Sequence, residues 1–161
     1  MQSTVLQKMA LYFGQDVRRI NHALKVYGFT QILLEGEKVS GETRLITELA
    51  AILHDIGIKE AERKYQSSAG HFQEAEGPAV AIKILQECGI NGLVADKVCF
   101  LVGHHHSYSK IDGIDFQILV EGDFLVNIFE GYIPAEAAPA TVKKYFRTQT
   151  GIDLAKSMYN L

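Results

Sequence analysis

The spacing of the apolar residues is the feature that most limits how this chain can fold. From residue 3 onward, apolar side chains recur at intervals of three and four, as on one face of a helix. No segment shows the sustained alternation of apolar and polar residues that is typical of a half-buried strand. Gly14, Gly57 and Gly89 fall where three of these helical patterns end. The pattern therefore predicts an all-α bundle of about six to seven helices.

The helical patterns cover most of the chain. We expect helices over about residues 3–13, 17–37, 40–57, 74–88, 91–102 and 115–128, a seventh whose start is bracketed by Pro134 and Pro139 and which includes Val142, Tyr145 and Phe146, and a short helical tail after Gly151. Residues 58–72 and 107–114 are polar or rich in turn-forming residues, so they are predicted to be loops, the first with one short helical turn. No repeat or linker interrupts the chain. We therefore predict one domain over residues 1–161, with a core at about 16–130 and a C-terminal helical extension at 131–161.

Composition narrows the classes of partner. The 161 residues are 47% apolar and 22% charged, which is ordinary for a globular domain, and the net charge is −3. Nucleic acid and anionic membranes are therefore not expected as partners. The first residues do not resemble a secretory signal, and no apolar run approaches the ~18 residues of a membrane span. Cys88 and Cys99 are isolated within helical patterns, so we predict buried free thiols and a cytoplasmic protein.

The histidines are the unusual part of the composition, because three of the six are consecutive, at positions 104–106. His22 lies in the second expected helix, and His54-Asp55 follows the apolar run LAAIL. Asp123 lies within ILVEGDFLVNIF, where a buried carboxylate needs a cation or several hydrogen-bond donors. Imidazole and carboxylate together suit Zn, Fe, Mn, Ni or Co. Because these residues are far apart in sequence, any such site must be assembled by the fold.

Each of these residues also has a simpler explanation when it is taken alone. His22 alone would be a half-exposed histidine, and His54-Asp55 could be a polar pair at a helix end. Asp123 could form an ion pair with Arg18 or Arg19 on another helix. The metal hypothesis therefore rests on the joint occurrence of these residues in several apolar helices.

The order His22, His54-Asp55, Asp123 resembles the H…HD…D signature of the HD-domain metal-dependent phosphohydrolases. RRINHALKVYGF is similar to the family's first histidine helix, and LAAILHDIG is similar to its most recognisable phrase. HHH, followed by a loop and ILVEGDFLVN, resembles the later histidines and the final aspartate. The similarity covers roughly residues 16–130.

The resemblance implies an all-helical fold and a divalent metal held by His22, His54, Asp55 and Asp123. The metal would be Fe, Mn, Ni, Co or Zn, with Mg also admissible. The implied reaction is hydrolysis of a nucleotide or other small phosphate ester by metal-activated water. We expect Asp55, His104 and His105 to be catalytic. Positive charge for the phosphate oxygens is expected from Arg18, Arg19, Lys25, Lys59 and Lys64.

One departure from the family pattern concerns a second metal. Many two-metal members carry a further histidine at the start of the fourth helix, which corresponds here to the neighbourhood of Gln73 rather than His71. Candidate ligands for a second ion are Glu74, Glu76, His104 and His105. We therefore expect one tightly held metal and leave a second open, while His71 and His106 are expected to be exposed.

Two alternatives use the same scaffold. A di-iron oxygenase would need two irons, and the missing histidine near Gln73 disfavours it. A non-catalytic module would keep the metal for structure or for holding a nucleotide. The absence of a Gly-Tyr-Pro phrase after the histidines argues against the branch that cleaves cyclic diguanylate. The exposed faces of the first and last helices could pair into a homodimer.

Overall fold

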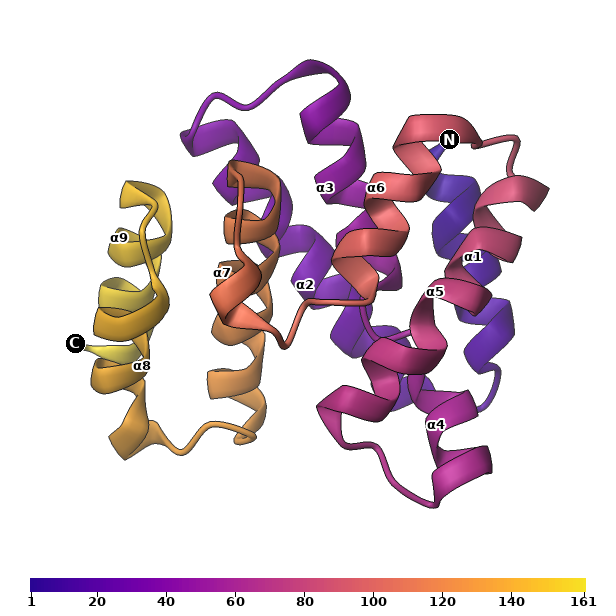
Figure 1. Ribbon diagram of the computed structural model, residues 1–161. Coiled ribbons are helices and arrows are strands. Elements are labelled where there is room, and N and C mark those ends of the chain that lie inside the picture. The colour runs from indigo at the N-terminus through magenta and orange to yellow at the C-terminus, as the bar shows by residue number, and fades with distance from the viewer.

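The chain is helical throughout (Figure 1). The computed structural model describes residues 1–161 and contains nine α-helices, two short 3₁₀ helices and no strand, which confirms the all-α prediction with more helices than predicted. The elements are α1 (Gln2–Phe13), α2 (Val17–Gly36), α3 (Gly41–Leu53), α4 (Ile58–Tyr65), α5 (Gly70–Glu87), α6 (Gly92–Val102), η1 (Tyr108–Lys110), α7 (Ile114–Glu130), η2 (Ala135–Ala137), α8 (Ala138–Tyr145) and α9 (Gln149–Tyr159). None of these helices combines the length and the apolar character needed to cross a membrane.

One hydrophobic core joins the ends of the chain. It runs from Val5 and Met9 in α1 to Phe146 and Ala155 near the C-terminus. Helices α2, α3 and α7 pack against one another at its centre, and α6 packs against α3. Figure 1 shows α8 and α9 beside α7, on the side of the molecule opposite α1 and α5. The C-terminal extension therefore packs on the same core as the rest.

Helix α7 is the most deeply buried element. Thirteen of its 17 residues are buried, so it is enclosed on nearly every side. Gly122 lies where α7 crosses α2, and a Cβ there would come within 2.9 Å of the Thr30 hydroxyl. Because α7 is enclosed, its acidic residues Glu121 and Asp123 are also buried and must find partners inside the protein.

The prediction of a loop with one short helical turn over residues 58–72 is wrong, because Ile58–Tyr65 form the eight-residue helix α4 and α5 already begins at Gly70. Ile58 and Ala61 are buried on one side of this helix, while the rest is rich in Glu, Lys and Arg. Those residues are good helix formers, so a short polar segment becomes helical once one face packs against α5.

The turn after α3 lies in backbone contact with α5. A Cβ at Gly57 would lie 2.4 Å from the carbonyl oxygen of Gln73 and 2.6 Å from the amide nitrogen of Gly77. Only glycine permits this approach. The contact holds the turn that carries His54 and Asp55 against the N-terminal half of α5.

Candidate metal centre

Two helices and one turn bring four polar residues together. His22 comes from α2 and Asp123 from α7, while His54 and Asp55 lie on the turn after α3. Nε2 of His22 lies 3.2 Å from Nε2 of His54 and 3.2 Å from Oδ1 of Asp123. Oδ2 of Asp55 lies 3.4 Å from Nε2 of His22 and 3.5 Å from Nε2 of His54. The four residues implied by the resemblance therefore converge on one point.

The orientation of the imidazoles suits a cation at that point. Nδ1 of His22 lies 2.8 Å from a carboxylate oxygen of Glu130, and Nδ1 of His54 lies 2.8 Å from the carbonyl oxygen of Ala51. These oxygens accept hydrogen bonds, so each Nδ1 is the donor and each neutral ring keeps its lone pair on Nε2. Two lone pairs then face each other beside two carboxylates. A divalent metal satisfies all four groups at once.

A second group of ligand atoms lies next to the first. His105 donates from Nδ1 to the carbonyl oxygen of Val102 at 2.9 Å, which directs its Nε2 toward Oδ1 of Asp55 at 3.4 Å. This Nε2 is buried and has no hydrogen-bond partner. Ligand atoms of Asp55, His105 and His106 lie within 4.8 Å of one another. Because its two oxygens face different groups, Asp55 stands between two candidate ion positions.

The electrostatics of the cluster favour bound positive charge. Burial alone would lower the pKa of His54, but the Asp55 and Asp123 carboxylates outweigh burial and hold this pKa well above its ordinary value. Burial alone would raise the pKa of Asp123, but its hydrogen bonds with His22 and His54 hold it below the usual range. Without a metal, protons on the imidazoles balance the carboxylates. Protons and metal ions therefore compete for the same nitrogens.

His106 differs from the other histidines of the cluster. Burial, followed by the charge on His105, lowers the pKa of His106 to about 4. Its ring is therefore neutral near pH 7 and keeps a lone pair. Its Nε2 also lies 3.1 Å from the side-chain oxygen of Gln73, the position at which the family pattern led us to look for a further histidine.

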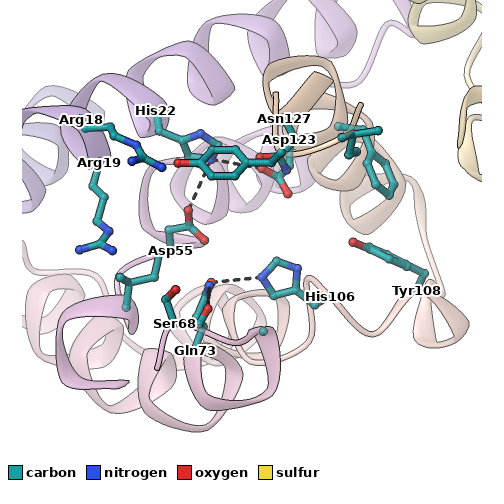
Figure 2. A pocket seen from close by; sticks show the side chains of 15 residues that line it. Arg18, Arg19, His22, Asp55, Ser68, Gln73, His106, Tyr108, Asp123 and Asn127 are labelled. Atoms are coloured by element: carbon teal, nitrogen blue, oxygen red, sulfur yellow. Dashed lines mark hydrogen bonds and ion pairs between the residues drawn. The ribbon is translucent and has the colours of Figure 1, made fainter. Parts of the chain in front are cut away.

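The cluster forms one wall of a pocket of about 510 Å³, a size that suits a small-molecule ligand (Figure 2). Figure 2 shows His22, Asp55 and Asp123 facing the pocket from one side and Gln73, His106 and Tyr108 bordering it from others. The lining residues are Arg18, Arg19, His22, Asp55, Ile58, Ser68, Gly70, Gln73, His106, Tyr108, Asp123, Phe124, Asn127, Tyr132 and Ile133.

Of the basic residues expected to contact phosphate, only Arg18 and Arg19 line this pocket. Arg19 is already ion-paired with Asp16 and Glu62, both at 2.6 Å. Arg18 has no carboxylate partner, and its guanidinium carbon lies 5.1 Å from the centre of the Tyr132 ring. Arg18 is therefore the cation of the pocket whose charge is not already neutralised.

The three lysines have other partners outside the pocket. Lys25 forms an ion pair with Glu130 at 2.5 Å, and Lys64 forms one with Glu76 at 2.6 Å. Lys59 donates to the backbone carbonyl of Tyr12 at 2.8 Å. The structure therefore does not place Lys25, Lys59 or Lys64 where they would contact a ligand beside the histidines.

Three other predicted residues also lie outside the two ligand groups. His104 packs against Phe100 with ring centres 4.4 Å apart and donates from Nδ1 to the Phe100 carbonyl oxygen. Glu74 accepts hydrogen bonds from the amide of His106 and the hydroxyl of Ser107, so it orders the histidine turn. Glu76 binds Lys64 and Tyr65 beside α4. The structure thus pairs His105 with His106 rather than with His104, Glu74 or Glu76.

The two histidines expected to be exposed differ. His71 is exposed, as expected, whereas His106 is half-buried and lines the pocket. The sequence reasoning also missed Glu130, Asn127, Tyr108 and Tyr132. Glu130 could have been found from the sequence, because it follows Asp123 by seven residues and so shares its face of α7.

Comparison with known families agrees with this geometry. The family model described as HD domain matches residues 19–141, most of the chain and all four residues of the first cluster. The chain belongs to the HD domain family. This assignment places it among proteins that are generally metal-dependent hydrolases, and the His and Asp groups described above are its candidate metal ligands. Searches of the curated proteins and of the solved structures found no match.

Proposed function

We propose that this HD-domain protein is a metal-dependent phosphohydrolase that cleaves a small phosphate ester of about nucleotide size. One observation carries the proposal: the imidazole nitrogens and carboxylates of the cluster converge on the wall of a pocket that also holds the unpaired Arg18. Metal ligands and a free guanidinium facing the same space suit a phosphate group, which needs both kinds of positive charge.

Different side chains would bind the metal and the phosphate. His22, His54, Asp55 and Asp123 would hold the ion, and His105 and His106 with Asp55 would hold a second ion if one binds. When bound, the metal supplies a water of lowered pKa and polarises a phosphoryl oxygen. Arg18 would bind the remaining phosphate oxygens.

The far side of the pocket would contact the rest of the substrate. Tyr108, Phe124 and Tyr132 offer aromatic surface, and Asn127 and Ser68 offer hydrogen bonds. Burial, followed by the charge of Asp123, raises the pKa of Tyr108 to about 12. Its hydroxyl therefore stays protonated near pH 7 and would donate a hydrogen bond to the substrate. A mixed aromatic and polar wall suits a nucleoside or a similarly flat group.

The experiment that tests the proposal is a hydrolysis screen. The purified, untagged protein is assayed for phosphate release from phosphomonoesters, nucleotides and cyclic nucleotides with Mn, Co, Ni or Fe added. We expect metal-dependent hydrolysis of at least one class, and its loss in Asp55→Ala with the fold retained by circular dichroism. Metal binding without hydrolysis of any substrate would contradict the proposal and favour a binding module.

The same purified protein can be used to distinguish a di-iron oxygenase from a phosphohydrolase. Two groups of ligand atoms share Asp55, so two ions could bind side by side. A di-iron oxygenase would show about two irons per chain and turnover that requires oxygen. Phosphate ester hydrolysis proceeds equally well without oxygen.

A further inference from the structure

The end of α7 reaches the metal centre from outside the pocket. Glu130 is the last residue of α7, and its Oε2 accepts the hydrogen bond from Nδ1 of His22 at 2.8 Å. Asp123 and Glu130 lie seven residues, or about two helical turns, apart on the same face of α7. The imidazole of His22 therefore spans these two turns, with Nε2 at Asp123 and Nδ1 at Glu130.

A second residue of α2 holds the same carboxylate. Nζ of Lys25 lies 2.5 Å from Oε1 of Glu130, and Lys25 follows His22 by three residues on α2. Two side chains of one helix thus bind the two oxygens of one carboxylate on another helix. The side chains of His22 and Glu130 are only 7% and 12% exposed, so their contact is largely shielded from water, whereas Lys25 is 37% exposed.

The position of Glu130 is unfavourable for a carboxylate unless it is compensated. Gly131 adopts a left-handed conformation, with φ 80°, and ends α7 there. The C-terminal end of a helix carries partial negative charge, which disfavours an acidic residue in the last turn. Lys25 and His22 supply the compensation, and this cost argues that the carboxylate is there for the imidazole.

The other imidazoles of the centre lack such a partner. His54 and His105 each donate from Nδ1 to a backbone carbonyl three residues earlier, on Ala51 and Val102. Those partners are neutral and come from the same turn of chain. Only the Nδ1 of His22 has a charged partner, and that partner comes from a different helix. A carboxylate on the far nitrogen fixes the tautomer of a metal-binding histidine and strengthens the other nitrogen as a ligand.

We propose that Glu130 is a positioning residue of the metal centre, which directs Nε2 of His22 toward the ion and increases its basicity, and that Lys25 holds Glu130 in place. The inference rests on the proposed metal-dependent function. It assigns Lys25 to the support of a ligand rather than to substrate phosphate. Glu130 does not line the pocket, so it acts through His22 and not on the substrate.

The test measures Co²⁺ affinity rather than catalysis. We expect Glu130→Gln, which keeps an acceptor but loses the charge, to weaken Co²⁺ binding about 10-fold, and Glu130→Ala to weaken it toward 100-fold. Lys25→Met should have a smaller effect in the same direction. Glu35→Gln removes an acidic charge from an 80% exposed side chain near the far end of α2 and serves as the matched control, with unchanged affinity.

A spectroscopic readout separates positioning from general stability. Nitrogen-detected NMR of the metal-free protein, at a pH high enough for the spectrum to show a neutral His22 ring, should show His22 protonated at Nδ1 in the wild type and a mixture of tautomers in Glu130→Ala. Equal Co²⁺ affinities in the folded wild type and both Glu130 variants would overturn this role and leave the metal-dependent function standing. A wild-type protein that binds no Co²⁺ would overturn both.

Discussion

Two buried carboxylates stand two residues apart on α7 and have opposite surroundings. Glu121 is fully buried and accepts hydrogen bonds from the backbone amides of Arg147 and Thr148 at 2.7 and 3.0 Å. It also accepts hydrogen bonds from the side chains of Gln117 and Thr148. All of these hydrogen-bond donors are groups of the protein itself, so Glu121 needs no bound cation. This carboxylate ties the segment between α8 and α9 to α7.

Asp123 is 6% exposed, but its polar partners are the imidazoles of His22 and His54. Those rings hold their Nδ1 protons in bonds to other groups, so they donate to Asp123 only when they carry an extra proton. Burial alone therefore does not identify a functional acid. What distinguishes Asp123 is that its neighbours are bases that also require a cation.

The largest effect is expected from Asp123→Asn. It removes one negative charge and one ligand from the centre, so we expect metal-dependent hydrolysis to fall about 100-fold or more. Glu121→Gln is the matched substitution, and its folded fraction should hydrolyse substrate at the wild-type rate. The measurement is kcat/KM per folded protein. Equal losses of kcat/KM in the two variants would show that Asp123 and Glu121 do not differ in function.

Glu121→Ala tests the structural half of the comparison. It leaves the buried amide of Thr148 and the partly buried amide of Arg147 without their acceptor, and an unsatisfied buried group costs about 1–3 kcal/mol. We expect the free energy of unfolding to fall by about 3 kcal/mol in urea titrations, while Co²⁺ affinity of the folded protein is unchanged. An undiminished stability would show that Glu121 does not anchor the C-terminal helices.

The two acids should also differ in how they affect stability against pH. Burial lowers the pKa of His22 and His54, but the neighbouring carboxylates more than reverse this and raise both pKa values. In the metal-free protein this stabilisation is fully present below the unfolded-state pKa of about 6.5 and is lost as pH rises through the raised folded-state values. We therefore expect the metal-free protein to be less stable at pH 9 than at pH 6.

Saturating metal should reverse that trend, because protons then compete with the ion for the imidazoles. Asp123→Asn should flatten the pH dependence of the metal-free protein, whereas Glu121→Gln should preserve it. Thermal unfolding at several pH values, with and without Co²⁺, checks these signs. A metal-free wild-type protein that is more stable at pH 9 than at pH 6 would contradict the assignment.

The smallest effect is expected on KM, from substitutions of the two neighbouring arginines on α2. Arg18 has no carboxylate partner, whereas Arg19 is paired with Asp16 and Glu62. We expect Arg18→Ala to raise KM about 10-fold, the value of one charge-assisted hydrogen bond, and Arg19→Ala to raise it less than about threefold. Steady-state kinetics on the best substrate of the screen measures both. A larger effect at Arg19 would reverse the assignment of phosphate binding.

Much of this arrangement could be predicted from the sequence. Helical periodicity was sufficient for the long helices, because their apolar faces are continuous. His22, His54, Asp55 and Asp123 could be found because ligand-type residues inside apolar helices are conspicuous. The short helix α4 was missed because only Ile58 and Ala61 mark its buried face.

Side-chain partners could not be predicted in the same way. The sequence shows that Lys25 is a cation, but only the crossing of α2 and α7 pairs it with Glu130 instead of a ligand. The direction of each consecutive histidine depends on the turn after α6, which sends His105 and His106 toward Asp55 and His104 toward Phe100. Such choices are made by backbone geometry over a few residues, which periodicity does not describe.

The most direct test of the account is the metal content of untagged protein. Wild type, Asp123→Asn and Glu121→Gln are each dialysed against Co²⁺, freed of excess ion and analysed for metal per folded chain. We expect at least one equivalent in wild type and in Glu121→Gln, and almost none in Asp123→Asn. A wild-type protein without metal, or an Asp123→Asn protein that retains as much as wild type, would contradict the assignment of this cluster as a metal centre.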